Sequence, residues 1–176
     1  MLTPDRRESG FTLIELLIVV GIIAVITALA AAGLLRSRAA ANEASAIQSM
    51  RVTSSSQKAY AVACGRGAYA SSYLVLGAPP PGGNVGDGFI SIDLGGAMNP
   101  MKSGFRFSLV AGAGSTAGPT DCNGVPTITA FLATAVPLSV VSGARSFAVT
   151  ENGTIWQIKG GTAPTEPFGL PAHPVQ

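Results

Sequence analysis

The N-terminal part of the chain contains one long apolar segment with very few polar side chains. Residues 11–35 read FTLIELLIVVGIIAVITALAAAGLL, in which Glu15 is the single charge and Thr12 and Thr27 are the other polar positions. As a helix this segment would extend about 37 Å, against a hydrocarbon core of roughly 30 Å. The pattern therefore predicts a membrane-spanning helix.

A cleavable secretory signal is the main alternative for this segment. Arg6 and Arg7 form a basic start, and the three alanines at 30–32 imitate a small-residue cleavage site. Against this, the apolar run exceeds the usual core of about 7 to 15 residues, and a discarded signal has no use for Glu15. A carboxylate in an apolar helix is costly unless it snorkels to the interface or is paired, so Glu15 is a functional candidate.

A weaker helical pattern continues beyond the apolar segment. Residues 36–66 contain no proline and their first glycine is Gly65, so we expect the helix to reach about Cys64. A weak stripe predicts the face that packs on the rest of the chain: Ala40, Ile47, Ser54 and Ala61, with Met50 and Cys64 on the same side. The basic residues outnumber Glu43 and predict a solvated face, with a partner-facing one as the alternative: Arg36, Arg38, Arg51, Lys58 and Arg66.

The remainder of the chain alternates irregular stretches with short β patterns. The run PPPGG at 79–83 excludes a helix or an inner strand there. Five segments predict an antiparallel meander: 88–94, 104–110, 127–134, 145–150 and 154–158. The clearest hairpin joins the last two through Asn152 and Gly153, since glycine accepts a positive φ. The turn also matches the glycosylation pattern Asn-Gly-Thr, but turn formation already explains both residues.

Composition and residue types argue against several classes of function. The chain is 47% hydrophobic and 11% charged with a net charge of +2, which favours neither a disordered tail nor a nucleic-acid partner. His173 is the single histidine, and the glycine-rich residues 111–118 lack a phosphate-binding lysine. Asp87, Asp93 and Asp121 do not have the spacing of a calcium loop. We therefore expect no enzyme, no cofactor and no metal site.

The residues around the start of the apolar segment resemble a known signature. The sequence GFTLIE at 10–15, preceded by a short charged leader, is similar to the prepilin signature of type IV pilins and type II secretion pseudopilins. The resemblance implies cleavage after Gly10 by an inner-membrane prepilin peptidase and N-methylation of the new terminus, Phe11. It also implies that the apolar helix forms the core of a filament, where Glu15 pairs with the terminal amine of a neighbouring subunit.

The resemblance sets further expectations for the helix. Small residues at spacings of three and four would let helices pack closely, although plain alanine richness explains them equally: Gly21, Ala24, Ala28 and Ala31 or Ala32. Arginines flank the apolar segment equally on both sides, so the cytoplasmic leader and outward-facing remainder follow from the resemblance. Many family members carry proline where this chain has Ala32, and Gly33 is only a weak substitute as a helix breaker.

Cys64 and Cys122 are the two cysteines of the chain. In an outward-facing domain they would lie in an oxidising compartment, where such a pair usually forms a disulfide, and two free buried thiols are the alternative. The bond would span 122 − 64 = 58 positions and attach the helix end to the loop before the third predicted strand. Many pilins instead close a C-terminal loop, so their receptor-binding loop does not transfer to this chain.

The predicted fold is α+β, with a long N-terminal helix packed on a small antiparallel sheet. Its parts are a leader (1–10), a membrane and filament-core helix (11–35), an amphipathic continuation (36–66) and a sheet domain (67–176). The resemblance implies a structural subunit of a type IV pilus or pilus-like filament. A type II secretion pseudopilin and a membrane-anchored binding domain that never polymerises are the alternatives.

The same resemblance implies partners and a location. The partners would be identical or related pilin subunits, the prepilin peptidase that also methylates, an inner-membrane assembly platform and lipid. The chain would first be a single-pass protein of the bacterial inner membrane with a periplasmic C-terminal domain. After assembly it would lie in a pilus on the cell surface.

Overall fold

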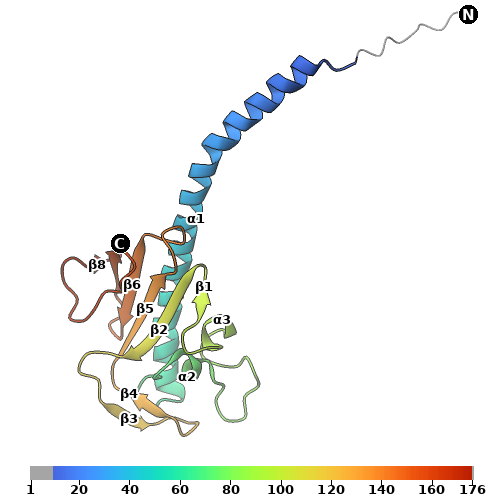
Figure 1. Ribbon diagram of the computed structural model, residues 1–176. Coiled ribbons are helices and arrows are strands. Elements are labelled where there is room, and N and C mark those ends of the chain that lie inside the picture. The colour runs from blue at the N-terminus through green and yellow to red at the C-terminus, as the bar shows by residue number, and fades with distance from the viewer. Residues whose placement is uncertain (1–9, 176) are drawn as a thin grey trace, which may run out of the picture. The chain divides into compact units, whose positions relative to one another are not determined.

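The structure is a computed structural model that describes residues 10–175 (Figure 1). The helices and strands follow one another along the chain as α1 (Leu13–Ala63), α2 (Tyr73–Gly77), α3 (Ile92–Gly95), β1 (Met101–Lys102), β2 (Phe105–Ala111), β3 (Ala117–Thr120), β4 (Pro126–Ile128), β5 (Phe131–Pro137), β6 (Arg145–Thr150), β7 (Ile155–Lys159) and β8 (His173–Pro174). The chain divides into two units between Ser37 and Arg38. We call the second unit, residues 38–175, the head.

Helix α1 has defined signals at both of its ends. It begins after Thr12, whose hydroxyl accepts the backbone N–H of Glu15 at 3.3 Å. The chain leaves the helix through Arg66 and Gly67, which adopt positive φ values of 53° and 90°. The prediction of one helix that ends at about Cys64 is confirmed, and this 51-residue helix continues through position 32.

The N-terminal unit presents apolar side chains to its surroundings. From Gly10 to Ser37, every side chain whose burial the structure describes is exposed. This part of α1 is long and apolar enough to cross a membrane, and its most apolar window buries nothing. A helix of a water-soluble domain would instead place an apolar stripe against its own core. The apolar surface of α1 is therefore available to lipid or to other protein chains.

The head is built on a six-stranded antiparallel sheet with the order β1-β2-β5-β6-β7-β8. The sheet lies against the C-terminal half of α1 (Figure 1). Four buried aromatic side chains on the helix-facing side form the centre of the core: Phe105, Phe107, Phe131 and Phe147. Strands β3 and β4 form a separate two-stranded ribbon between β2 and β5. The predicted α+β fold is confirmed, and the ribbon interrupts the predicted meander.

Three of the five predicted strands match the structure closely. Segments 104–110, 145–150 and 154–158 correspond to β2, β6 and β7. The predicted hairpin joins β6 to β7, and Gly153 in its turn has a φ of 78°. The Gly153 N–H donates to the Thr150 carbonyl at 2.9 Å, which closes the turn.

The strand predicted at 88–94 is wrong. Its second half begins the short helix α3, because the N–H groups of Leu94 and Gly95 both donate to the Ser91 carbonyl, at 3.0 and 2.8 Å. Gly88 and Gly95 lie directly against the backbone of Gly77 at the end of α2. Through these contacts the segment packs α3 against α2, so it cannot pair as a strand.

The strand predicted at 127–134 is divided between two sheets. At the break, the Thr129 N–H donates to the Thr116 carbonyl at 3.1 Å and the Ala130 N–H donates to the Ser115 hydroxyl at 3.2 Å. The chain thereby leaves the ribbon as β4 and enters the main sheet as β5. Strands β1, β3 and β8 were not predicted, because they are two to four residues long and too short for a visible alternation.

The buried face of α1 is only partly the predicted one. Four residues of the predicted stripe are buried, namely Met50, Ser54, Ala61 and Cys64, whereas Ala40 is exposed and Ile47 is half-buried, so the stripe was placed off centre. The buried residues of α1 also include Glu43, Ala46, Thr53, Gln57 and Tyr60. Several of them are polar and are buried through hydrogen bonds: Gln57 accepts from the Ala70 N–H at 2.9 Å and donates to its carbonyl at 3.0 Å. Apolar periodicity does not detect such residues.

Candidate functional site

The predicted processing position precedes α1. Gly10 and Phe11 are outside the helix and are exposed, and Phe11 retains 78% of its accessible surface. A side chain at position 10 would meet no atom within 4 Å, so packing does not require a glycine there. The backbone at this point is accessible, as a peptidase requires. The other nine residues of the predicted leader, 1–9, lie outside the described residues.

Glu15 occupies the first turn of α1, three residues after the cap Thr12. The pattern Thr-x-x-Glu at 12–15 is that of a capping box, in which the acid can serve the free backbone N–H groups of the first turn. The positive end of the helix dipole also favours a carboxylate at this position. Within residues 10–175 the two ion pairs are formed by other residues. The Glu15 carboxylate is exposed and can therefore reach a cation on another chain.

The small residues predicted to permit close helix packing lie in the same unit. Gly21, Ala24, Ala28 and Ala31 are exposed in the helix, and a side chain at position 21 would meet no atom within 4 Å. No packing inside the described chain therefore explains Gly21.

Glu43, a second carboxylate of α1, is buried and paired, whereas Glu15 is exposed. Glu43 is only 7% exposed, and its Oε2 accepts hydrogen bonds from Arg145 Nε at 2.8 Å and Nη2 at 2.6 Å. Its Oε1 accepts the backbone N–H groups of Ala144 at 2.7 Å and of Arg145 at 3.1 Å. Arg145 also donates to Gln157 Oε1 at 2.7 Å. This ion pair fastens α1 to the start of β6.

From the sequence, Glu43 was expected on the solvated face, and Arg145 was not a candidate residue. The two residues are 102 positions apart, and neither stands in a motif. The single available signal was an isolated acid in a segment that otherwise carries basic residues.

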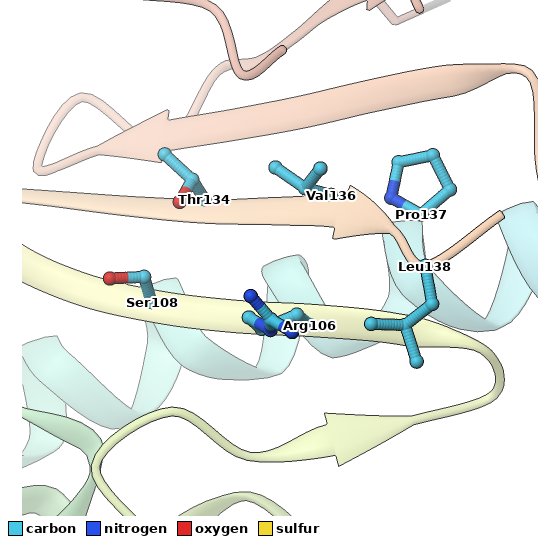
Figure 2. A pocket seen from close by; sticks show the side chains of 6 residues that line it. All are labelled: Arg106, Ser108, Thr134, Val136, Pro137 and Leu138. Carbon is cyan, nitrogen blue, oxygen red and sulfur yellow. The ribbon is translucent and has the colours of Figure 1, made fainter. Parts of the chain in front are cut away.

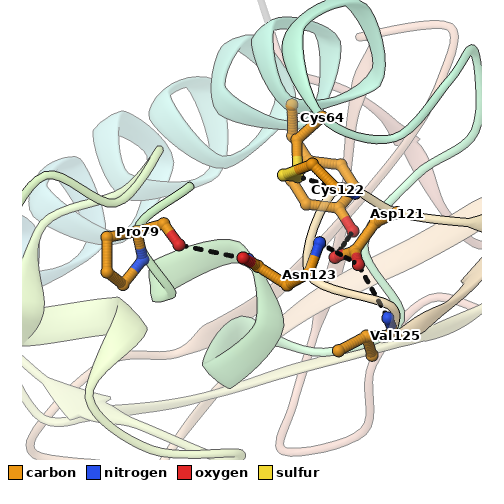
Figure 3. Close-up of a disulfide and its surroundings, with 7 residues drawn as sticks. Cys64, Pro79, Asp121, Cys122, Asn123 and Val125 are labelled. Carbon is orange, nitrogen blue, oxygen red and sulfur yellow. Dashed lines mark hydrogen bonds between the residues drawn. A yellow bond between two sulfur atoms is a disulfide. The ribbon is translucent and has the colours of Figure 1, made fainter. Parts of the chain in front are cut away.

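The C-terminal end of α1 is attached to the turn between β3 and β4 by a disulfide and a buried hydrogen bond (Figure 3). Cys64 and Cys122 are joined, with their Cα atoms 4.8 Å apart. Next to them, Tyr60 donates to Asp121 Oδ2 at 2.7 Å. Burial, followed by this hydrogen bond and the charge of Asp121, raises the pKa of Tyr60 above its ordinary value. The tyrosine is therefore a neutral donor at physiological pH.

Asp121 also shapes the turn that carries Cys122. Its Oδ1 accepts the backbone N–H groups of Asn123 at 2.8 Å and Val125 at 2.7 Å. Asn123 in turn donates to the carbonyl of Pro79 at 3.1 Å (Figure 3). The turn between β3 and β4 is thereby attached to α1 and to the proline-rich segment.

An open groove lies on the sheet face that points away from α1 (Figure 2). It is lined by residues of β2 and β5 and of the chain that follows β5: Arg106, Ser108, Thr134, Val136, Pro137 and Leu138. The lining contains one charged group and neither a histidine nor a carboxylate. These side chains offer a binding surface but no nucleophile with an adjacent base.

The acids considered as calcium ligands are separate from one another. Asp87 accepts from Asn84 at 2.8 Å, Asp93 pairs with Lys102 at 3.4 Å, and Asp121 serves the turn described above. In residues 10–175, no group of three or more His, Cys, Asp and Glu side chains could hold a metal ion.

Comparison with known proteins identifies the N-terminal region. Residues 5–31 match a family model described as the prokaryotic N-terminal methylation motif. This motif is the signature of prepilin-type proteins, the type IV pilins and pseudopilins, so the resemblance stated from the sequence is confirmed. No significant match was found among curated proteins or among solved structures. The motif supports a pilin-like or pseudopilin-like substrate of a prepilin peptidase, with a structural role.

Proposed function

We propose that this chain is a structural subunit of a type IV pilus or a related filament. The observation that carries the proposal is the methylation motif at residues 5–31, which continues from Leu13 into a helix whose apolar side chains are exposed. Lipid covers this surface before assembly, and the helices of neighbouring subunits cover it in the filament. One surface thus serves first as a membrane anchor and then as the filament core.

In the proposed assembly step, Glu15 recognises a processed neighbour. Cleavage after Gly10 creates a positively charged amine at Phe11, four residues before the carboxylate. An amine of one subunit and Glu15 of the next can pair when the two helices are staggered along their axes. A buried charge whose partner is missing costs about 3 to 5 kcal/mol, so the pair selects processed subunits in the correct stagger.

The head supports a periplasmic location before assembly. Its disulfide fits an oxidising compartment, which agrees with a cytoplasmic leader and an outward-facing head. The disulfide, together with a C-terminal part that lacks a recognisable major-pseudopilin pattern, favours a pilus over a type II secretion pseudopilus. Prepilin peptidase, an inner-membrane assembly platform, lipid and other pilin subunits are the proposed partners.

Mass spectrometry of the mature N-terminus tests the processing step. We expect a chain that begins with methylated Phe11, because the likeness of residues 10–15, GFTLIE, to the prepilin signature implies a cut after Gly10. Retention of Met1, or a terminus beyond residue 30, would contradict the proposal. Recovery of the chain in filaments sheared from the cell surface would distinguish a pilus from a pseudopilus.

The variant Glu15→Gln tests the role of the charge. Glutamine can replace glutamate in a capping box, so the substitution removes the charge while it retains the cap. We expect normal cleavage and a folded head, but filament yield at least about tenfold lower because the neighbouring amine is unpaired.

Thr12→Ala is the matched control for this variant. It removes the cap, at a cost of about 1 kcal/mol, and leaves the Glu15 charge in place, so filaments should still form. Equal loss of filaments in both variants would mean that Glu15 acts through the local helix start and not through a neighbouring subunit.

A further inference from the structure

The loop between β5 and β6, residues 138–144, exposes apolar side chains at one end of the head. We call it the 138–144 loop. Val140 is 90% exposed and Val141 is 53% exposed, and Leu138 is exposed beside them. The loop sequence LSVVSGA contains no charge. Adjacent β-branched apolar residues at a loop tip are not explained by the core of the head.

The base of the loop is attached to α1 near the point where the helix enters the head. The Ala144 N–H donates to Glu43 Oε1 at 2.7 Å, and Gly143 lies against Glu43 and Phe105. Ser142 lies against Gly104 and is only half-buried. The ion pair between Glu43 and Arg145 therefore fixes the loop to a defined turn of α1.

This turn of α1 is close in sequence to the apolar segment. Glu43 follows Leu35, the last residue of that segment, by eight positions. Eight residues advance about 12 Å as a helix and reach at most about 28 Å when fully extended. The chain itself thus keeps Glu43, and with it the base of the 138–144 loop, within this distance of the edge of a bilayer that contains the segment.

The charged residues near the base of the loop, and those in the chain between the apolar segment and Glu43, are basic. Arg106 lines the same groove as Leu138 (Figure 2), and Lys159 lies opposite Arg145 in the register of β6 and β7. Arg36 and Arg38 are exposed on α1 between the apolar segment and Glu43. The nearest acid, Glu43, is already neutralised by its ion pair. An apolar tip with a basic rim is complementary to a lipid surface with anionic head groups.

We infer that the 138–144 loop is a membrane-contact element, which inserts Val140 and Val141 into the lipid interface while the subunit waits for assembly. The inference rests on the proposed function, since it requires the apolar segment to be in a bilayer. Extraction into a filament then has to remove this second contact as well as the helix.

Fluorescence quenching by brominated lipids tests the contact. The full chain carries a single tryptophan, Trp156, which is replaced by Trp156→Phe so that the introduced indole is the only emitter. Val140→Trp is compared with Val85→Trp, whose site is 95% exposed and lies in the loop after Pro79, attached near the other end of α1. Both variants are reconstituted in vesicles of brominated phosphatidylcholine and phosphatidylglycerol.

We expect roughly half of the emission at position 140 to be quenched and little at position 85, because interfacial elements reach the head-group and acyl boundary. Equal, weak quenching at both sites in vesicle-bound protein would overturn the inference alone. So would blue-shifted but unquenched emission at 140, which would mean that a second copy covers the loop. Failure of the chain to remain with the vesicles would contradict the proposed function itself.

Discussion

At the scale of single residues, the two carboxylates of α1 have different surroundings and different consequences. Glu15 is exposed in the first turn, whereas Glu43 is buried against Arg145. The first is free to pair with another chain, and the second is satisfied inside its own head. A carboxylate on an apolar or small-residue helix therefore cannot be assigned a role until its partner is known.

Glu43→Gln should destabilise the head without changing its shape. The substitution leaves Arg145 without a counter-charge, and removal of one partner of a buried pair costs about 3 to 5 kcal/mol. Because the Arg145 side chain is 39% exposed, solvent screening reduces the expected loss to about 1 to 3 kcal/mol. Urea unfolding of the full chain in detergent, followed by Trp156 fluorescence, measures it.

The control is Asp93→Asn at the other ion pair of the head. Asp93 and Lys102 are 3.4 Å apart, with side chains that are 62% and 34% exposed. Exposed pairs contribute about 0 to 1 kcal/mol, so this variant should unfold almost like the parent. Equal losses in the two variants would show that the Glu43 pair is no stronger than a surface pair.

At the scale of elements, α1 is fastened to the head at both ends of its buried face. The ion pair of Glu43 holds the first end, and the disulfide with the bond from Tyr60 to Asp121 holds the second. Between them, polar side chains such as Gln57 bind backbone groups of the chain that follows the helix. These contacts fix the rotation of the helix more narrowly than apolar packing alone.

Reduction of the Cys64–Cys122 bond should weaken the attachment of the C-terminal end of α1 to the rest of the head. The bond spans 58 positions, and the chain-entropy model gives about 4 kcal/mol for a closed loop of that length. We expect a lower unfolding midpoint with reductant, and faster hydrogen exchange first in residues 119–125. A double variant, Cys64→Ala with Cys122→Ala, should not respond to reductant. An unchanged midpoint in the parent would contradict this account.

At the scale of the whole molecule, the chain combines a unit without a core and a head with one. The N-terminal unit exposes its apolar side chains, and the head buries its phenylalanines between sheet and helix. The first unit gains stability only from lipid or from other subunits. The head is stabilised by its own core, its ion pair and its disulfide.

A chain that begins at Arg38 should therefore fold and remain in solution without detergent. The truncation retains the helix face from Glu43 to Cys64 and every strand of the structure. We expect a monomer in analytical ultracentrifugation that forms no filaments, because the apolar segment that would form the filament core is absent. Its thermal midpoint should match that of the full chain in detergent. Aggregation of the truncated chain would show that the head depends on residues 1–37.

Strong local patterns in the sequence determined the membrane-length helix, the methylation motif and the hairpin around Gly153. Each depends on neighbouring residues: an apolar run, a short motif, or a turn that needs a positive φ. Local chemistry of this kind is visible without a fold.

Only the tertiary structure decided which face of α1 is buried, where the predicted strand at 127–134 divides, and why residues 88–94 form no strand. These outcomes depend on partners far away in the chain: Arg145 for Glu43, Ala70 for Gln57, and Gly77 for Gly88. A polar residue is buried when a distant group satisfies its hydrogen bonds. Glu43 shows the reason: its own neighbourhood indicates solvent, and its partner 102 positions away places it in the core.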